Sequence, residues 1–266
     1  MTFAISFEAL AWLLGAMTIV WVISLIRRDA SMIDPFWGVA FPLTTWVYVA
    51  AADVWGPRQV VVLALVHVWG LRLSIYLLRR NWGLPEDRRY RAMREHAGSS
   101  FAWRSLFVVF WLQAFLAWVI SFPLHAALVS SRPGLAGLDW LGLGLFAAGF
   151  AFEVVGDWQL SRFKSDPTNQ GEVCSLGLWR YTRHPNYFGE AVLWWGLACF
   201  ALATPGAGWT FIGPTLLTAL LLKVSGVSLL EQDLRQRKPG YAAYVARTSA
   251  FVPWFPNPLS QVDADQ

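Results

Sequence analysis

The residues best suited to chemistry lie in one short stretch, Gly177–Glu190, with the sequence G-L-W-R-Y-T-R-H-P-N-Y-F-G-E. It places arginine, histidine, asparagine and glutamate side chains among aromatic rings, between two long apolar segments. Guanidinium groups can bind phosphates through paired hydrogen bonds, and aromatic rings can stack on a flat base. The stretch therefore suits a site that binds an anionic, partly aromatic ligand at a membrane surface. The simpler alternative is a positively charged loop with an interfacial aromatic belt.

Further candidates lie near or inside apolar segments, where polar side chains are costly. Glu153 and Asp157 are four residues apart, so a helix would present both carboxyl groups on one face, as a functional pair or within an ion-pair cluster. Asp34 stands at an apolar boundary, where desolvation would raise its pKa and let it donate a proton or hydrogen bond to a carbonyl group. The alternative is that Asp34 begins a helix, with Pro35 after it. His67 is expected to make a hydrogen bond between helices.

Several common site types are missing from the sequence. There is no glycine-rich phosphate loop and no nucleophilic serine motif. The four histidines are scattered without metal-ligand spacing, so no metal site is expected. Cys174 and Cys199 are expected to be unpaired thiols. A nucleotide would therefore be held by arginine, asparagine and aromatic side chains between helices.

The composition indicates that these residues are positioned by membrane helices. Of the 266 residues 56% are hydrophobic and only 14% are charged, whereas about a quarter of a soluble domain is charged. The mean hydropathy is +0.43, and the 17 tryptophans fit anchoring at a bilayer interface. No cleavable signal peptide is evident. The net charge of +4 is small and gives no indication of nucleic-acid binding.

The sequence predicts an all-α, polytopic helical bundle in the membrane. A helix needs roughly 20 apolar residues to cross the bilayer core, and the chain contains several such stretches. Seven spans are predicted, the second and sixth of them short: Phe7–Ile26, Phe36–Ala52, Arg58–Leu78, Leu106–Leu128, Leu138–Gly156, Phe188–Leu202 and Trp209–Val224. Residues Leu229–Tyr244 are expected to form an amphipathic helix broken at Pro239-Gly240. A single membrane domain is predicted, with substrate-side helices in 1–137 and cofactor-binding helices in 138–266.

The basic residues predict the orientation. All but three of the 21 lie in the loops after spans one, three and five or in the tail, the exceptions being Arg58, Arg72 and Arg132. Arg72 lies within the third span, near enough to its end for the guanidinium to reach the interface. The positive-inside rule therefore places the amino terminus outside and the carboxyl terminus in the cytoplasm. The stretch Gly177–Glu190 would face the cytoplasm.

The stretch L-W-R-Y-T-R-H-P-N-Y-F-G-E resembles the signature of the steroid 5α-reductase-like membrane proteins, most of all their bacterial branch. The resemblance continues through D-W-Q-L-S-R-F-K, S-L-L-E-Q-D-L and K-P-G-Y-A-A-Y, and covers roughly the last 115 residues. The first half matches mainly at S-M-I-D-P-F-W-G and W-G-L-R-L-S-I-Y. The R-H-P-N-Y core is also similar to sterol C14-reductases and, with a different residue after the proline, to isoprenylcysteine and phospholipid methyltransferases.

The resemblance implies seven spans in a bacterial inner membrane, NADPH bound from the cytosol and a lipid-like substrate from the bilayer. The residues that would line the dinucleotide pocket by position are Asp157, Lys164, Trp179, Arg180, Arg183, His184, Asn186, Tyr187 and Glu190, closed by Glu231 and Tyr241 from the tail. Glu153 stands where the steroid reductases have an asparagine. Asp34 and Trp69 would be the catalytic residues that hold the substrate ketone, but an indole N–H donates only a hydrogen bond.

Three functions remain open from the sequence. The first is an NADPH-dependent reductase of a carbon–carbon double bond conjugated to a carbonyl group. The second is a methyltransferase that uses S-adenosylmethionine and a lipid or thiol acceptor. Asn186 favours the reductase, as do the surrounding arginines, which suit a pyrophosphate better than a cationic sulfonium. The third is a scaffold or transporter, against which the absence of a polar path through the spans argues.

Overall fold

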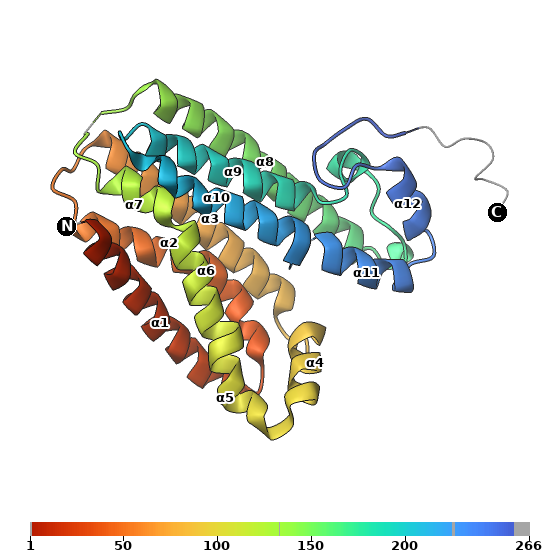
Figure 1. Ribbon diagram of the computed structural model, residues 1–266. Helices are drawn as coiled ribbons and strands as arrows, with labels where there is room; N and C mark the ends of the chain where they lie inside the picture. The colour runs from red at the N-terminus through yellow and green to blue at the C-terminus, as the bar shows by residue number, and fades with distance from the viewer. Residues whose placement is uncertain (1, 133, 225–226, 258–266) are drawn as a thin grey trace. The chain divides into compact units, whose positions relative to one another are not determined.

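The computed structural model describes residues 2–132, 134–224 and 227–257, and all regular structure in these ranges is helical (Figure 1). The predicted all-α class is confirmed. The longer helices are α1 (Thr2–Arg27), α2 (Ile33–Ala50), α3 (Pro57–Asn81), α4 (Arg88–Ala97), α8 (Gly137–Ser165), α9 (Pro185–Leu202) and α11 (Val227–Arg237). The shorter ones are α5 (Phe101–Ser105), α6 (Leu112–Ile120), α7 (Phe122–Leu128), α10 (Ile212–Ala219) and α12 (Tyr241–Arg247).

Four helical segments among the described residues are long and apolar enough to cross a membrane: Ala4–Arg27, Pro57–Asn81, Arg88–Ile120 and Gly137–Ser165. They contain most of the first, third, fourth and fifth predicted spans, so a multi-pass membrane protein is supported. The second and sixth predicted spans fall on α2 and α9, and the seventh on the shorter apolar segment Ala207–Lys223. The number seven and the orientation stay predictions.

The fourth span begins much earlier than the sequence analysis expected. The helical segment starts at Arg88, where the Asp87 side chain accepts a hydrogen bond from the Arg89 backbone N–H and so caps it. It runs through a π-helical stretch (η3, Leu106–Trp111) into α6. It ends at Ser121, because Pro123 lies in the first turn of the next helix, α7.

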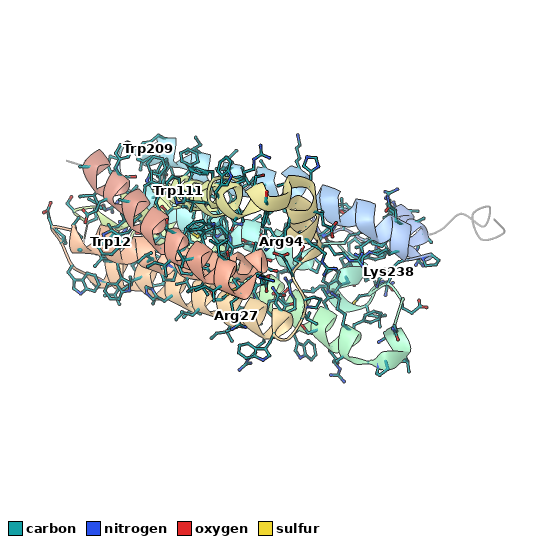
Figure 2. All side chains as sticks on the ribbon, turned by 90° about the horizontal axis from the view of Figure 1, so that it is seen from below. Trp12, Arg27, Arg94, Trp111, Trp209 and Lys238 are labelled. Carbon is teal, nitrogen blue, oxygen red and sulfur yellow. The ribbon has the colours of Figure 1, made fainter. Side chains whose placement is uncertain are left out.

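Two compact units make up the chain. Unit 1 consists of Met1–Asp139 and Ala198–Gly213, and unit 2 of Trp140–Leu197 and Pro214–Gln266. The end of α9 and the segment after it belong to unit 1. The division of a single domain into substrate-side helices in 1–137 and cofactor-binding helices in 138–266 stays a prediction. Within unit 1 the labelled Arg27 and Arg94 lie toward one end of the helices and Trp12 toward the other (Figure 2).

In unit 1 the backbones of α2 and α3 touch. A Cβ atom on Gly38 would lie 2.4 Å from the Gly70 carbonyl oxygen, and a Cβ on Gly70 would lie 2.4 Å from that of Gly38. Such close approach needs small residues at the crossing, which is the usual way for helices to pack where no hydrophobic force acts between them. This contact holds Asp34 and Trp69, which belong to these two helices, in fixed positions.

A buried ion pair joins the start of α3 to the start of α8 in unit 1. The Arg58 Nε lies 3.2 Å from the Asp139 Oδ1, and both side chains are fully buried. Arg58 also donates to the carbonyl oxygens of Ala127 and Phe200, which are near the ends of α7 and α9 and have no partner within their helices. Asp139 Oδ2, in the first turn of α8, accepts a hydrogen bond from the backbone N–H of Ala136, the residue just before this helix, at 2.7 Å.

In unit 2 the helices α8 and α9 lie side by side (Figure 1) and also meet through glycines. A Cβ on Gly149 would lie 2.5 Å from the Gly189 carbonyl oxygen, and one on Gly196 would lie 2.7 Å from the Gly142 carbonyl oxygen. The spacing of seven residues on each helix keeps the small residues on one seam. Trp195 Nε1 donates to Thr218 Oγ1 at 3.2 Å, which joins α9 to α10.

The Gly149→Ala variant should be destabilised by about 1–3 kcal/mol, because the new methyl group has no room between two backbones. Gly144→Ala is the matched control on the same helix, since nothing lies within 4 Å of a Cβ at that position. It should keep or raise the melting temperature, as alanine favours a helix more than glycine does. Thermal unfolding of the detergent-purified variants measures both melting temperatures. Equal values for the two variants would contradict the close packing of α8 against α9 at Gly149.

Candidate functional site

The stretch Gly177–Glu190 is held as an ordered connection between α8 and α9. It begins with a short 3-10 helix (η5, Gly177–Arg180), and Pro185 starts α9. Trp179 is buried, and its Nε1 donates to the Gly156 carbonyl oxygen at 3.0 Å. Tyr244 of α12 donates its hydroxyl to the Trp179 carbonyl oxygen at 2.5 Å. Trp179, predicted to line the pocket, therefore serves here as the anchor of the stretch.

Arg183 is the main link between this stretch and the last two helices. Its Nε lies 2.8 Å from Glu231 Oε1, and its Nη1 donates to the carbonyl oxygens of Thr248 at 2.6 Å and Val245 at 3.2 Å. His184 Nε2 lies 3.1 Å from the same Glu231 oxygen. The predicted trio of Arg183, His184 and Glu231 is thus brought together, but the Arg183 guanidinium is already occupied by partners within the protein.

A second polar pair lies on facing turns of α8 and α9. Asn186 Nδ2 donates to Asp157 Oδ1 at 3.0 Å. Asp157 and Glu153 are buried one turn apart on α8, and Glu190 is buried one turn beyond Asn186 on α9. The predicted presentation of both carboxyl groups on one helix face is consistent with this arrangement. Because a carboxylate accepts and an amide donates here, the carbonyl oxygen of Asn186 remains an acceptor for a further donor.

One ring contact and two exposed basic side chains complete the candidate residues of this region. The Tyr187 ring stacks on the His184 ring, with centroids 5.5 Å apart and an angle of 4° between planes. Arg180 is exposed, and no hydrogen bond or ion pair joins its side chain to another described residue. Lys164 is exposed near the end of α8. Arg180 is therefore the arginine of this stretch that is available to bind an anion.

The pKa values of Glu231 and Tyr241 are shifted by burial and by neighbouring charges. Burial opposes ionisation of Glu231, but hydrogen bonds from His184 and Arg183 outweigh it and hold the pKa of Glu231 below its usual 4.5. Burial, with the nearby Glu231 carboxylate, raises the pKa of Tyr241 to about 12. Tyr241 therefore stays neutral and Glu231 ionised at physiological pH.

The Glu231 interaction predicts a particular response to acid. Since the pKa of Glu231 is lower in the folded state, its stabilising contribution is fully present above pH 4.5 and is lost as pH falls through the folded-state pKa. Glu231→Gln should lower the melting temperature at pH 7, and its difference from wild type should shrink on acidification. Glu172→Gln, an exposed position, is the control. A difference that does not change with pH would contradict the prediction.

The two predicted catalytic residues lie in unit 1, in different surroundings. Trp69 is fully buried, with its ring centroid 5.4 Å from that of Phe41. Asp34 lies two residues before the second predicted span, and its Oδ1 accepts the Tyr90 hydroxyl at 2.8 Å. The Arg89 guanidinium lies 3.3 Å from Asp34 Oδ2. Burial, only partly offset by Arg89 and Tyr90, raises the pKa of Asp34 above its usual 3.8.

The segment that carries Tyr90 is itself fixed to the start of α2. Glu86 accepts the Ala30 N–H at 2.8 Å and pairs with Arg94 at 2.7 Å. The Asp87 N–H donates to Ser31 Oγ at 2.9 Å. These bonds place Tyr90 against Asp34 across 56 residues of sequence. If the Tyr90 hydroxyl turns from Asp34 to a ligand, the phenol and a protonated Asp34 carboxyl group can each donate one hydrogen bond to a carbonyl oxygen.

The profile of a family described as proteins of unknown function (DUF1295) matches residues 20–248. The chain belongs to the DUF1295 family. This family includes steroid 5α-reductase-like membrane proteins, so the resemblance is supported at that level, while the bacterial branch stays a prediction. An uncharacterized protein of Schizosaccharomyces pombe is 23% identical over 271 residues, which cover 92% of this chain and 78% of the relative. No solved structure matches the chain.

Other features of this DUF1295 protein bear on the predicted sites. Among the described residues no group of histidine, cysteine, aspartate and glutamate side chains could hold a metal ion, and both cysteines are free. His67 Nδ1 bonds the Leu63 carbonyl oxygen at 2.8 Å within its own helix, so the expected hydrogen bond between helices is replaced by a local one. The guanidinium carbon of Arg72 lies over the Tyr76 ring, 5.2 Å from its centroid.

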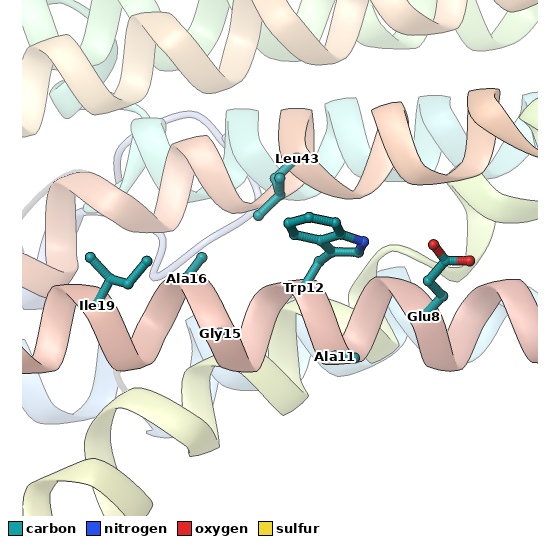
Figure 3. Close-up of a pocket in the computed structure, with 7 residues that line it drawn as sticks. All are labelled: Glu8, Ala11, Trp12, Gly15, Ala16, Ile19 and Leu43. Carbon is teal, nitrogen blue, oxygen red and sulfur yellow. The ribbon is translucent and has the colours of Figure 1, made fainter.

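A groove of about 520 Å³ runs along α1 beside α2 in unit 1 (Figure 3). Its lining is mostly apolar and comprises Glu8, Ala11, Trp12, Gly15, Ala16, Ile19 and Leu43. None of the candidate site residues contributes to it. In a membrane helix such a groove suits the hydrocarbon chain of a lipid, and we assign it no part in chemistry.

The sequence analysis missed Tyr90 and Tyr244. Tyr90 stands among arginines in a polar segment, and no local pattern connects it to Asp34. Tyr244 belongs to the motif K-P-G-Y-A-A-Y, which resembles the steroid 5α-reductase-like proteins, but its bond to a backbone carbonyl depends on tertiary structure. The amphipathic helix expected over Leu229–Tyr244 is present as α11 and α12, with the interruption at Lys238–Gly240.

Proposed function

We propose that this protein is a membrane-embedded oxidoreductase that uses NADPH to reduce a carbon–carbon double bond conjugated to a carbonyl group in a steroid-like or other lipid substrate. The observation that carries the proposal is the stretch that leads into α9, in which the exposed Arg180 precedes Asn186, paired with Asp157, and the Tyr187 ring. It combines an anion-binding cation, an amide and an aromatic face. The family's steroid 5α-reductase-like members add to this support.

The donor set in unit 2 fits a dinucleotide phosphate in part. Arg180 would bind a phosphate group, aided by the backbone N–H groups at the start of the 18-residue helix α9. Asn186 would orient a polar group of the cofactor, and Tyr187 would offer its ring face. Arg183, His184 and Glu231 would act indirectly, by holding α11 and α12 against the stretch.

NADPH supplies a hydride to the carbon β to the substrate carbonyl when it is bound. The protein's task is then to stabilise the negative charge that develops on the carbonyl oxygen. Within unit 1, Asp34 and Tyr90 would be the candidate hydrogen-bond donors to a carbonyl oxygen, the Tyr90 hydroxyl turning from Asp34 to the ligand. Donors aimed at a developing oxyanion are a large catalytic term. A proton added at the α carbon completes the saturated product. The indole N–H of Trp69 stays a predicted hydrogen-bond donor to the substrate carbonyl.

The proposal includes seven spans and a cytoplasmic face for the Arg180 region, in a bacterial inner membrane. The asymmetric distribution of basic residues supports this orientation, and NADPH is a cytosolic cofactor. The bilayer would deliver the hydrophobic substrate directly to the membrane helices.

Thermal stability of the detergent-purified protein with NADPH, NADH, S-adenosylmethionine or no ligand tests the proposal. A ligand at 100 times its dissociation constant stabilises by about 2.7 kcal/mol, which is measurable. NADPH should raise the melting temperature, and Arg180→Ala and Asn186→Ala should reduce that rise. Arg104→Ala, an exposed arginine in unit 1, should leave it unchanged. A rise with S-adenosylmethionine alone would replace the reductase by a methyltransferase, and no rise with NADPH would contradict the proposal.

A further inference from the structure

The segment after the last helix exposes large apolar side chains from a fixed backbone. In Phe251–Phe255 the exposed fractions are 59% for Val252, 69% for Trp254 and 77% for Phe255. Residues 241–257 contain no aspartate or glutamate, and their one basic residue, Arg247, is exposed. Contiguous exposed apolar side chains of this size mark an interaction surface.

Hydrogen bonds hold this segment in place, so its exposure does not result from a loose chain end. The Arg183 N–H donates to the Ser249 carbonyl oxygen at 2.9 Å, and Thr182 Oγ1 donates to that of Phe251 at 2.8 Å. The Trp254 N–H donates to the Tyr181 carbonyl oxygen at 2.9 Å. The segment runs beside residues 181–183 and presents its apolar side chains outward.

Ring contacts connect the same segment to a membrane helix. Phe152 lies in α8, within one of the candidate spans, and its ring centroid is 5.4 Å from that of Phe188 in the first turns of α9. Phe188 in turn lies 5.8 Å from Phe251. The Tyr181 ring meets Phe255 at 6.2 Å. The exposed group is therefore continuous with the part of unit 2 that would be in contact with lipid.

We propose that Phe251–Phe255 is a membrane-interface anchor, which inserts Trp254 and Phe255 among the lipid headgroups of the membrane that holds the helices. Tryptophan is favoured at this depth, and phenylalanine inserts into the same region from interfacial segments. Arg247, with no acidic residue in 241–257, suits anionic headgroups. The anchor would fix the stretch Tyr181–Arg183 at the membrane surface. The inference is independent of the proposed catalytic activity.

Site-directed spin labelling of the full chain in vesicles of phosphatidylcholine and phosphatidylglycerol tests the anchor. Labels at Phe255→Cys and at the matched control Gln236→Cys, an exposed position on α11, would be compared after Cys174→Ser and Cys199→Ser. The label at 255 should collide more with oxygen, which concentrates in lipid, and several-fold less with a water-soluble nickel chelate. Equal access of the nickel chelate to both positions would overturn the proposal.

A second measurement keeps both native cysteines. Benzoylphenylalanine introduced at 255 should form a phospholipid adduct on illumination, detected by mass, and the same group at 236 should not. Adducts at neither position, or equally at both, would contradict the anchor. An adduct at 255 in vesicles of phosphatidylcholine alone as well as in the mixed vesicles would assign the contact to the aromatic side chains rather than to Arg247.

Discussion

Arg58→Ala is expected to destabilise the protein by about 3–5 kcal/mol, because it leaves the buried Asp139 carboxylate without its partner. The substitution also removes the donor to the carbonyl oxygens of Ala127 and Phe200. Those carbonyl groups lie near helix ends in buried residues, so without Arg58 they would be left without a donor, which adds to the destabilisation. Thermal unfolding in detergent should show a large fall in melting temperature.

Two comparisons make the Arg58 prediction specific. Arg104→Ala removes an exposed arginine whose guanidinium lies 5.9 Å from the Trp103 ring, and it should shift the melting temperature little. The double change Arg58→Met with Asp139→Leu removes both charges together and should be less damaging than Arg58→Ala alone. A melting temperature for Arg58→Ala within error of wild type would show that the ion pair does not secure this end of unit 1.

This ion pair also shows where sequence analysis stops. An apolar run of 20 or more residues is enough to predict a membrane helix, which is why α1, α3 and α8 were located correctly. The same reasoning treated Arg58 as the start of a span and gave Asp139 no role, since 81 residues separate them. Charge pairing in a folded core depends on which helix ends meet, and no local pattern encodes that.

Polar helices are harder to predict than apolar ones. The segment Arg88–Ala97 has six charged or histidine side chains in ten positions, and its helix continues into the apolar stretch that was taken as the whole span. A capping aspartate, Asp87, marks its start, but one such residue is a weak signal. Missing α4 meant missing Tyr90, and therefore the partner of Asp34.

The assignment of the stretch as a binding site stays a prediction, but the structure shows which of its residues contact one another. Of the residues assigned by the motif, Asp157 contacts Asn186 and Arg183 contacts Glu231. It could not separate residues that hold the fold from residues that face a ligand. Arg183 and Arg180 look alike in the sequence, yet the first is occupied by internal partners and the second is exposed.

For the proposed reductase, Tyr90→Phe should lower turnover of an enone lipid by about 10²–10³-fold, the usual effect of removing one donor to a developing oxyanion. The protein should remain folded, because the change removes only the bond to Asp34 and a long bond from Gln113 Nε2, each worth roughly 1 kcal/mol. Asp34→Asn should reduce turnover at least as much. NADPH consumption by proteoliposomes that contain the enone measures both, with NADPH binding checked by the thermal shift.

The pH dependence distinguishes this role from a purely structural one. Since burial raises the pKa of Asp34, the carboxyl group keeps its proton to a higher pH than usual, and turnover should fall as pH rises through that pKa. Asp34→Asn should lose this part of the pH profile, whereas Trp69→Phe should retain it if the indole serves only packing. Wild-type turnover and pH profile in Tyr90→Phe would exclude the pair as the carbonyl-binding group, while leaving the dinucleotide site in unit 2 to stand on its own binding data. The catalytic role of Asp34 and Tyr90 is therefore tested by turnover and its pH profile, whereas the Arg180 variants test cofactor binding.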